Sequence, residues 1–179
     1  MTPELQNEFR RFADAARQSL RDVPVSGSYR HVFSIWTMPS FSPASRCTIY
    51  SPLPFVKGEQ PFADFTIWRS DLDYEKYRTP VERLRHPKEL VPTIENEVVW
   101  LTDDEVTAME DCLRGISVPF YLGRSTVVGC DGTAFEFKYD EVFFGASLHW
   151  WENHPTEWRP LIEAVTRIVD ELRGRKKAS

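Results

Sequence analysis

The stretch DGTAFEFKYDEVFFGASLHWW, residues 131–151, decides the fold class of this chain. Asp131-Gly132 is a pair favoured in two-residue β-hairpin turns, and apolar and charged side chains alternate after it as far as Tyr139. A second alternating run, Phe143–Trp151, follows directly. Because period two is typical of half-buried antiparallel strands, we expect a β-meander here, with an earlier strand over Ser125–Cys130.

The end of this stretch carries two adjacent tryptophans, Trp150 and Trp151. Neighbouring residues of a strand point to opposite faces, so both rings cannot enter one core. We expect one to pack under a helix and the other to meet a loop, a partner or a groove.

Three amphipathic helices are expected around this sheet. The first follows Thr2-Pro3, and the last covers Thr156–Arg173. Between them, Thr102 and Glu105 have the spacing of a capping box, and Gly115 is expected to end that helix in a left-handed conformation.

Further strands are predicted nearer the N-terminus. In the first of them, alternation places Phe33 and Ile35 on one face and Val32 and Trp36 on the other. Eight of the thirteen prolines lie within about 39–92, which predicts a largely irregular segment there. The predicted strands are Tyr29–Met38, Arg46–Tyr50, Ala63–Arg69 and Ile94–Leu101.

Residues 1–179 therefore read as one α+β domain, a mainly antiparallel twisted sheet packed against N-terminal, middle and C-terminal amphipathic helices. Hydrophobic residues make up 41% of the chain, and no run is long enough for a membrane helix. No signal-peptide pattern follows Met1, and Cys47, Cys112 and Cys130 are widely spaced. We expect a cytoplasmic protein with reduced thiols and no membrane association.

Charge is distributed unevenly along the chain. The balance is +2 over residues 1–60, −8 over 61–145 and +1 over 146–179. The acidic middle argues against nucleic-acid binding, which needs clustered Lys and Arg. It suits a basic protein partner, although an ordinary solvated acidic surface is the alternative.

Acidic and aromatic residues also gather in one short segment of the acidic middle. Tyrosine and tryptophan are favoured anchors of protein interfaces, and the adjoining carboxylates would attract a basic partner. A homodimer completed by an exposed tryptophan is another possibility. The candidate partner-binding residues are Asp71, Asp73, Tyr74, Glu75, Tyr77 and Trp151.

No signature of a nucleotide site is present, and we expect no cofactor or metal. His149, Glu152 and His154 lie close in sequence, but they are read as a polar strand end and turn.

A small hydrolase or sugar-acting enzyme, with a carboxylate or cysteine nucleophile in an aromatic cleft, is the alternative function. Cys130, His149 and Glu136 form one conceivable set. The carboxylate pairs Glu95 with Glu97 and Asp71 with Asp73 form others. Glu95 and Glu97 are more simply interpreted as the solvent-facing side of an edge strand, which protects against aggregation.

The C-terminal third reads Asp131-Gly132-Thr133, Phe135-Glu136, Trp150-Trp151, then Pro155, Trp158 and Pro160-Leu161. This order resembles uncharacterised bacterial proteins of immunity-protein type, with a DGT hairpin, a tryptophan strand end and a PxxWxPL helix start. The resemblance implies a non-enzymatic inhibitor that masks a basic toxin surface. The motif is structural and implies no catalytic residue.

Overall fold

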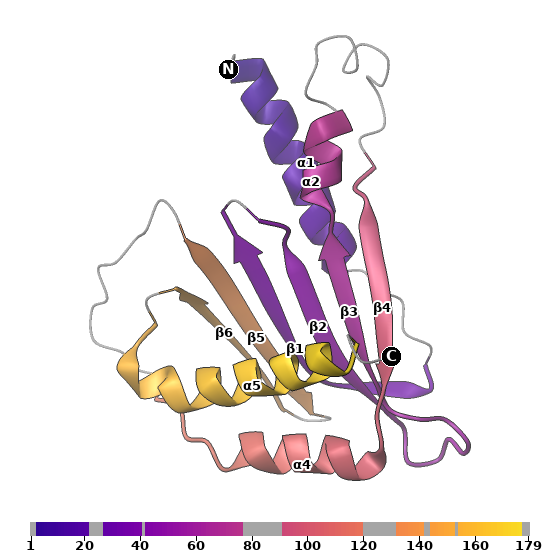
Figure 1. Cartoon of the computed structure of the whole chain (residues 1–179). Helices are drawn as coiled ribbons and strands as arrows, with labels where there is room; N and C mark the ends of the chain where they lie inside the picture. The colour runs from indigo at the N-terminus through magenta and orange to yellow at the C-terminus, as the bar shows by residue number, and fades with distance from the viewer. Residues whose placement is uncertain are drawn as a thin grey trace.

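A computed structural model of the chain describes residues 3–21, 27–40, 42–76, 91–119, 132–141, 144–152 and 154–176. Its centre is a six-stranded sheet in the order β4-β3-β2-β1-β5-β6, in which every neighbouring pair is antiparallel (Figure 1). The predicted α+β class with an antiparallel sheet is confirmed. The strands are β1 (Tyr29–Pro39), β2 (Ser45–Pro52), β3 (Phe62–Trp68), β4 (Ile94–Trp100), β5 (Thr133–Glu141) and β6 (Phe144–Trp151).

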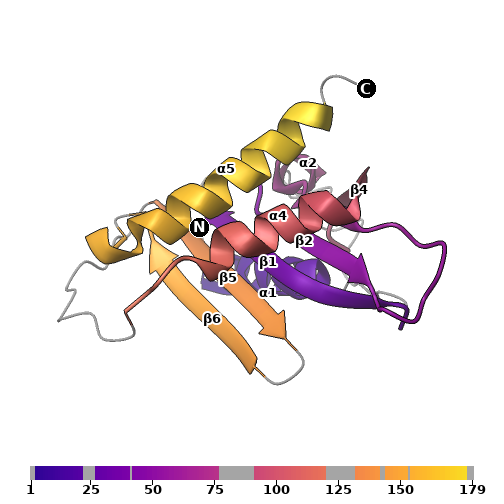
Figure 2. The same ribbon diagram turned by 90° about the horizontal axis from the view of Figure 1, so that it is seen from below.

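Helices lie on both faces of the sheet. Seen from below, α4 and α5 lie on one side of the strands and α1 on the other (Figure 2). We call these two sides the α5 face and the α1 face. The helices are α1 (Pro3–Arg21), α2 (Ser70–Lys76), α4 (Asp103–Arg114) and α5 (Arg159–Lys176), and the short 3-10 turn η1 (Thr156–Trp158) precedes α5.

The larger core fills the space between the sheet and the pair α4 and α5. Its aromatic members come from both strands and helix: Trp150 of β6 meets Trp158 of η1 edge to face, with ring centroids 6.3 Å apart. The pattern of the apolar residues in α5 explains this cover, because they recur at helical spacing and are buried along one side. Buried members of this core include Phe33, Ile35, Cys47, Ile49, Phe65, Val106, Phe137, Leu161, Val165 and Leu172.

A smaller core lies between α1 and the α1 face. Phe12 of α1 packs against Trp68 of β3 with ring centroids 5.8 Å apart, and Trp36 of β1 joins them. The expected apolar helix at the N-terminus is thus present and covers the opposite side of the sheet from α5.

Strand β1 contains an irregularity that alternation alone does not predict. His31 pairs with Tyr50, but Phe33 pairs with Ile49, so two residues of β1 span one step of β2. The bulge rotates Val32 into the larger core beside Phe33. The prediction that Val32 shares a face with Trp36 was therefore wrong.

Two other details differ from expectation. Strand β2 has eight residues and ends at Pro52, and β1 likewise ends at Pro39, because a proline is tolerated at the end of a strand. Helix α4 has its predicted capping box, but Gly115 ends it in the right-handed region at φ −74° and ψ −6°. The left-handed stop is therefore a wrong prediction. The predicted strand Ser125–Cys130 lies outside the described residues.

The α1 face also carries a buried ion pair. Arg46 Nη2 donates to Asp64 Oδ2 at 2.7 Å and to Thr66 Oγ1 at 3.1 Å, and all three side chains are almost fully buried. The guanidinium also lies over the ring of Trp36, 5.7 Å from its centroid. Opposite charges cancel here, so this cluster supplies no net charge to a ligand.

Candidate partner-binding site

Strand β4 forms one edge of the sheet and offers different chemistry on its two faces (Figure 1). Val98 and Trp100 project from the α1 face and are 45% and 60% exposed. Glu95 and Glu97 project from the α5 face, opposite Ile67 and Phe65 of β3. An acidic side and an apolar side therefore lie along the same edge of the described sheet.

Trp100 is the exposed end of a row of aromatic rings. Its ring lies 5.8 Å from that of Phe62, which lies 5.1 Å from Tyr50 and 5.0 Å from Tyr29. The hydroxyl of Tyr29 donates to Glu59 Oε2 at 2.5 Å. A large apolar ring held by its neighbours but open to solvent is typical of an interface anchor.

The segment around Trp100 is strongly acidic. Residues 91–113 contain seven Asp or Glu and no Lys or Arg. Asp103 and Asp104 are exposed in the first turn of α4, where their charges also stabilise the helix N-terminus. Hydrogen bonding from the Thr102 backbone N–H is the main cause that lowers the pKa of Glu105, so this carboxyl is ionised at neutral pH.

Arg69 joins the acidic edge to helix α2. It pairs with Glu95 at 2.6 Å and with Asp71 at 2.8 Å. The hydrogen bonds from Arg69 lower the pKa of Asp71. Two carboxylates share Arg69, so this group of three side chains carries one net negative charge. Arg175, Arg30 and Arg114 pair with Glu105, Glu110 and Asp111 further along the acidic segment.

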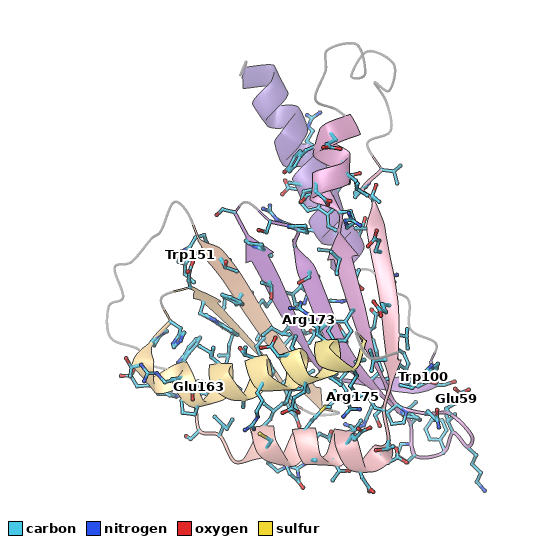
Figure 3. All side chains as sticks on the ribbon, viewed as in Figure 1. Glu59, Trp100, Trp151, Glu163, Arg173 and Arg175 are labelled. Carbon is cyan, nitrogen blue, oxygen red and sulfur yellow. The ribbon has the colours of Figure 1, made fainter. Side chains whose placement is uncertain are left out.

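Of the six residues predicted from sequence, the five that the structure describes do not form one surface. Asp71, Tyr74 and Glu75 are exposed on α2, with Tyr74 in contact with Trp68 at a centroid distance of 6.1 Å. Tyr77 lies outside the described residues. Trp151 lies on β6, at the other edge of the sheet from Trp100 (Figure 3).

Asp73 faces inward, and its side chain is fully buried. It accepts hydrogen bonds from Trp68 Nε1 and from the backbone N–H of Thr93, both at 2.9 Å, and from Thr93 Oγ1 at 2.6 Å. The carboxylate thus ties α2 to the start of β4 and adds nothing to the exposed surface.

Trp151 is half-buried because it packs over the backbone of Gly132, which has φ +140°. A Cβ at that glycine would lie 2.7 Å from Trp151 Nε1. The positive φ and the close approach both favour glycine there. Trp150, by contrast, is buried beneath η1, as expected for one of the two rings.

Trp100 and Val98 were missed as candidates because the sequence suggested that most tryptophans are core. A signal for them exists: Ile94-Glu95-Asn96-Glu97-Val98 places polar residues on both faces of the strand. A strand with polar residues on both faces has neither face fully covered, which is typical of an edge.

The structure describes two members of the alternative catalytic set, Glu136 and His149. Glu136 and His149 pair across β5 and β6, and Ser147 lies beside them. His149 Nε2 is 3.1 Å from Ser147 Oγ and 3.8 Å from Glu136 Oε1, so the serine and the acid approach the same nitrogen. In a catalytic triad the acid orients the other ring nitrogen. Cys130 lies outside the described residues.

A pocket of about 140 Å³ lies beneath α5, on the face opposite that cluster. Cys47 lies at its floor, where burial raises the pKa of the thiol to about 12 and keeps it protonated at neutral pH. Arg173 closes one side, donating to Ser45 Oγ at 3.3 Å. The lining residues are Ile35, Thr37, Ser45, Cys47, Phe135, Thr166, Val169, Asp170 and Arg173.

Among the described residues, no group of three His, Cys, Asp or Glu side chains is placed to hold a metal ion. Within the same ranges, no helix has the length and apolar character needed to cross a membrane. No protein-family model matches this chain, no curated protein is similar to it in sequence, and no solved structure matches its fold.

Proposed function

We propose that this chain is a protein-binding domain that docks a basic partner protein along the acidic edge formed by β4 and the start of α4. The observation that carries the proposal is Trp100, a tryptophan 60% exposed on an edge strand within a segment of seven acids and no bases. Exposed aromatics supply most of the contact energy at interfaces, and surrounding charge steers association.

The proposed docking surface lies on β4 and α4, whereas the site predicted from sequence lies on α2. Both belong to the same acidic region of the chain. Asp71 lies at the border of the docking surface, because Arg69 pairs with both Asp71 and Glu95. Asp73 instead has a structural role as a buried hydrogen-bond acceptor. A bacterial immunity-type role agrees with this surface, because masking a basic toxin requires a negative, partly apolar face. The product of a neighbouring reading frame is the first natural partner to test.

The test uses random heptapeptides displayed on phage and selected on the immobilised full chain. We expect enrichment of Lys- and Arg-containing peptides whose association slows as salt is raised. Trp100→Ala and the double variant Glu95→Lys/Glu97→Lys should each weaken binding by about tenfold or more.

Glu163→Lys is the control for a charge reversal away from the β4 edge, at one glutamate instead of two, since Glu163 is exposed at the far end of α5 from Arg173 and Arg175 (Figure 3). It should bind the selected peptides like the unaltered chain. Enrichment that ignores peptide charge, or peptides equally bound by Trp100→Ala and the double variant, would contradict the proposal.

A further inference from the structure

We infer that the partner adds a β-strand to the outer edge of β4, with basic side chains toward Glu95 and Glu97 and apolar side chains toward Val98 and Trp100. This inference rests on the proposed function and specifies how the partner is held. Three observations support it: alternate residues of β4 direct their backbone groups away from β3, no described strand pairs with that outer edge, and Glu95 and Glu97 make one face of it acidic.

The two ends of β4 establish which backbone groups face outward. The backbone N–H of Arg69 donates to the carbonyl of Thr93 at 2.8 Å, and that of Leu101 donates to Pro61 at 2.9 Å. In an antiparallel pair, residues that bond to the neighbour alternate with residues that do not. The odd-numbered residues of β4 therefore bond to β3, and the even-numbered ones point their N–H and C=O groups away from it.

Those outward groups belong to Ile94, at the start of the strand, and to Asn96, Val98 and Trp100 in its middle and C-terminal half. No strand within the described ranges pairs with this edge. Unpaired backbone donors and acceptors in a row are the template on which an extended peptide adds to a sheet. The strand of seven residues is long enough to set a register.

Charge selects a basic partner over a second copy of this chain. In an antiparallel pair of two β4 strands centred on Asn96, Glu95 and Glu97 would lie opposite Glu97 and Glu95 of the other copy on the same face, and like charges placed across strands are destabilising. A strand with Lys or Arg at alternate positions turns that repulsion into attraction. Its intervening apolar residues would extend the row formed by Trp100 and Phe62.

The experiment uses a capped synthetic heptapeptide of alternating lysine and valine as the probe. Amide hydrogen exchange of the full chain is followed by NMR with and without the peptide. We expect the amides of Asn96, Val98 and Trp100 to become protected, while that of Glu97, already directed to β3, changes little. A peptide of alternating glutamate and valine should protect none of them.

Val98→Pro tests the backbone directly, with Val98→Ala as its matched control. Proline removes an outward N–H and is tolerated on an edge strand at such a position, whereas both variants lose the valine side chain. We expect Val98→Pro to weaken peptide binding about tenfold relative to Val98→Ala. If Val98→Pro fails to fold, a peptide N-methylated at alternate residues removes the complementary hydrogen bonds, those that the peptide N–H groups would donate to the outward carbonyls of β4.

The outcomes separate this inference from the proposed function. Equal binding by Val98→Pro and Val98→Ala, with loss in Trp100→Ala and Glu95→Lys/Glu97→Lys, overturns strand addition and leaves side-chain docking. Insensitivity to Trp100→Ala and the double lysine variant overturns the proposed function itself. Protection of the same three amides by self-association, detected as a concentration-dependent dimer in sedimentation, overturns the choice of a basic partner.

Discussion

Asp71 and Asp73 have different structural roles although they are the same residue type two positions apart. Both lie in the same short helix and both have short charge-assisted contacts. Asp71 is half-exposed, where ion pairs contribute little, whereas Asp73 is the acceptor for three donors in a fully buried position.

Replacing Asp73 is therefore expected to cost far more stability than replacing Asp71. Asp73→Ala should lower the free energy of unfolding by about 2–4 kcal/mol, because Trp68 and Thr93 lose their acceptor. Asp71→Ala should lower it by less than about 1 kcal/mol. Urea titrations followed by tryptophan fluorescence measure both. Similar losses in the two variants would show that Asp73 is not the buried acceptor described.

At the scale of the element, helix α4 is held in place at its N-terminal turn. Its N-terminus has the capping box, in which Glu105 N–H donates to Thr102 Oγ1 at 3.2 Å and Thr102 N–H donates to Glu105 Oε2 at 2.7 Å. Glu105 also pairs with Arg175 of α5 at 2.5 Å. The cap thus fixes where the acidic edge ends and joins the two helices that cover the larger core.

Thr102→Ala should lower the free energy of unfolding by about 1 kcal/mol through loss of the cap. Thr107→Ala is the control, since Thr107 is exposed within the same helix and alanine is the better helix former. Chemical denaturation of both variants, with Thr102→Ser expected to recover most of the loss, is the measurement. An unchanged Thr102→Ala would mean that the cap is not needed to hold α4.

Elements also show what a periodic pattern can and cannot predict. The capping box, β6 with its two faces and the helix after Pro155 were predictable, because each depends on neighbours within about one helical turn or on strand alternation. The bulge at His31–Phe33 was not, since it depends on how β1 registers against β2, a strand across a proline-bounded loop. Val32 changed faces as a consequence.

At the scale of the whole molecule, the stability of the fold depends on pH through His31, a histidine on the α1 face. Burial lowers the pKa of His31; Asp140, 3.2 Å away, opposes this, and Lys138 and Arg46 reinforce it. The folded state therefore binds a proton less readily than the unfolded chain, whose histidine has its ordinary pKa of 6.5. Stability from this group is complete above that value and is lost as pH falls below it.

His31→Gln should accordingly flatten the loss of stability between about pH 7 and about pH 5.5. Asp71 and Glu105 have lowered pKa values, so their contributions are lost only below their ordinary values of 3.8 and 4.5. Urea midpoints at the two pH values, compared between His31→Gln and the unaltered chain, test this. An equal loss in both proteins would assign the pH dependence to other groups.

The sequence by itself determined the fold class, most elements and the acidic character of the middle segment, because hydrophobic period, caps and charge are local properties. Glu95 and Glu97 already indicated an edge strand from the sequence, but tertiary structure alone decided the order of the six strands, since strand order depends on pairings between residues far apart in the chain. It turned Asp73 inward and left Trp100 open to solvent. The burial of Asp73 and the exposure of Trp100 depend on contacts with residues distant in the sequence, which local patterns do not contain. For this reason the candidate site lies on β4 and not on α2.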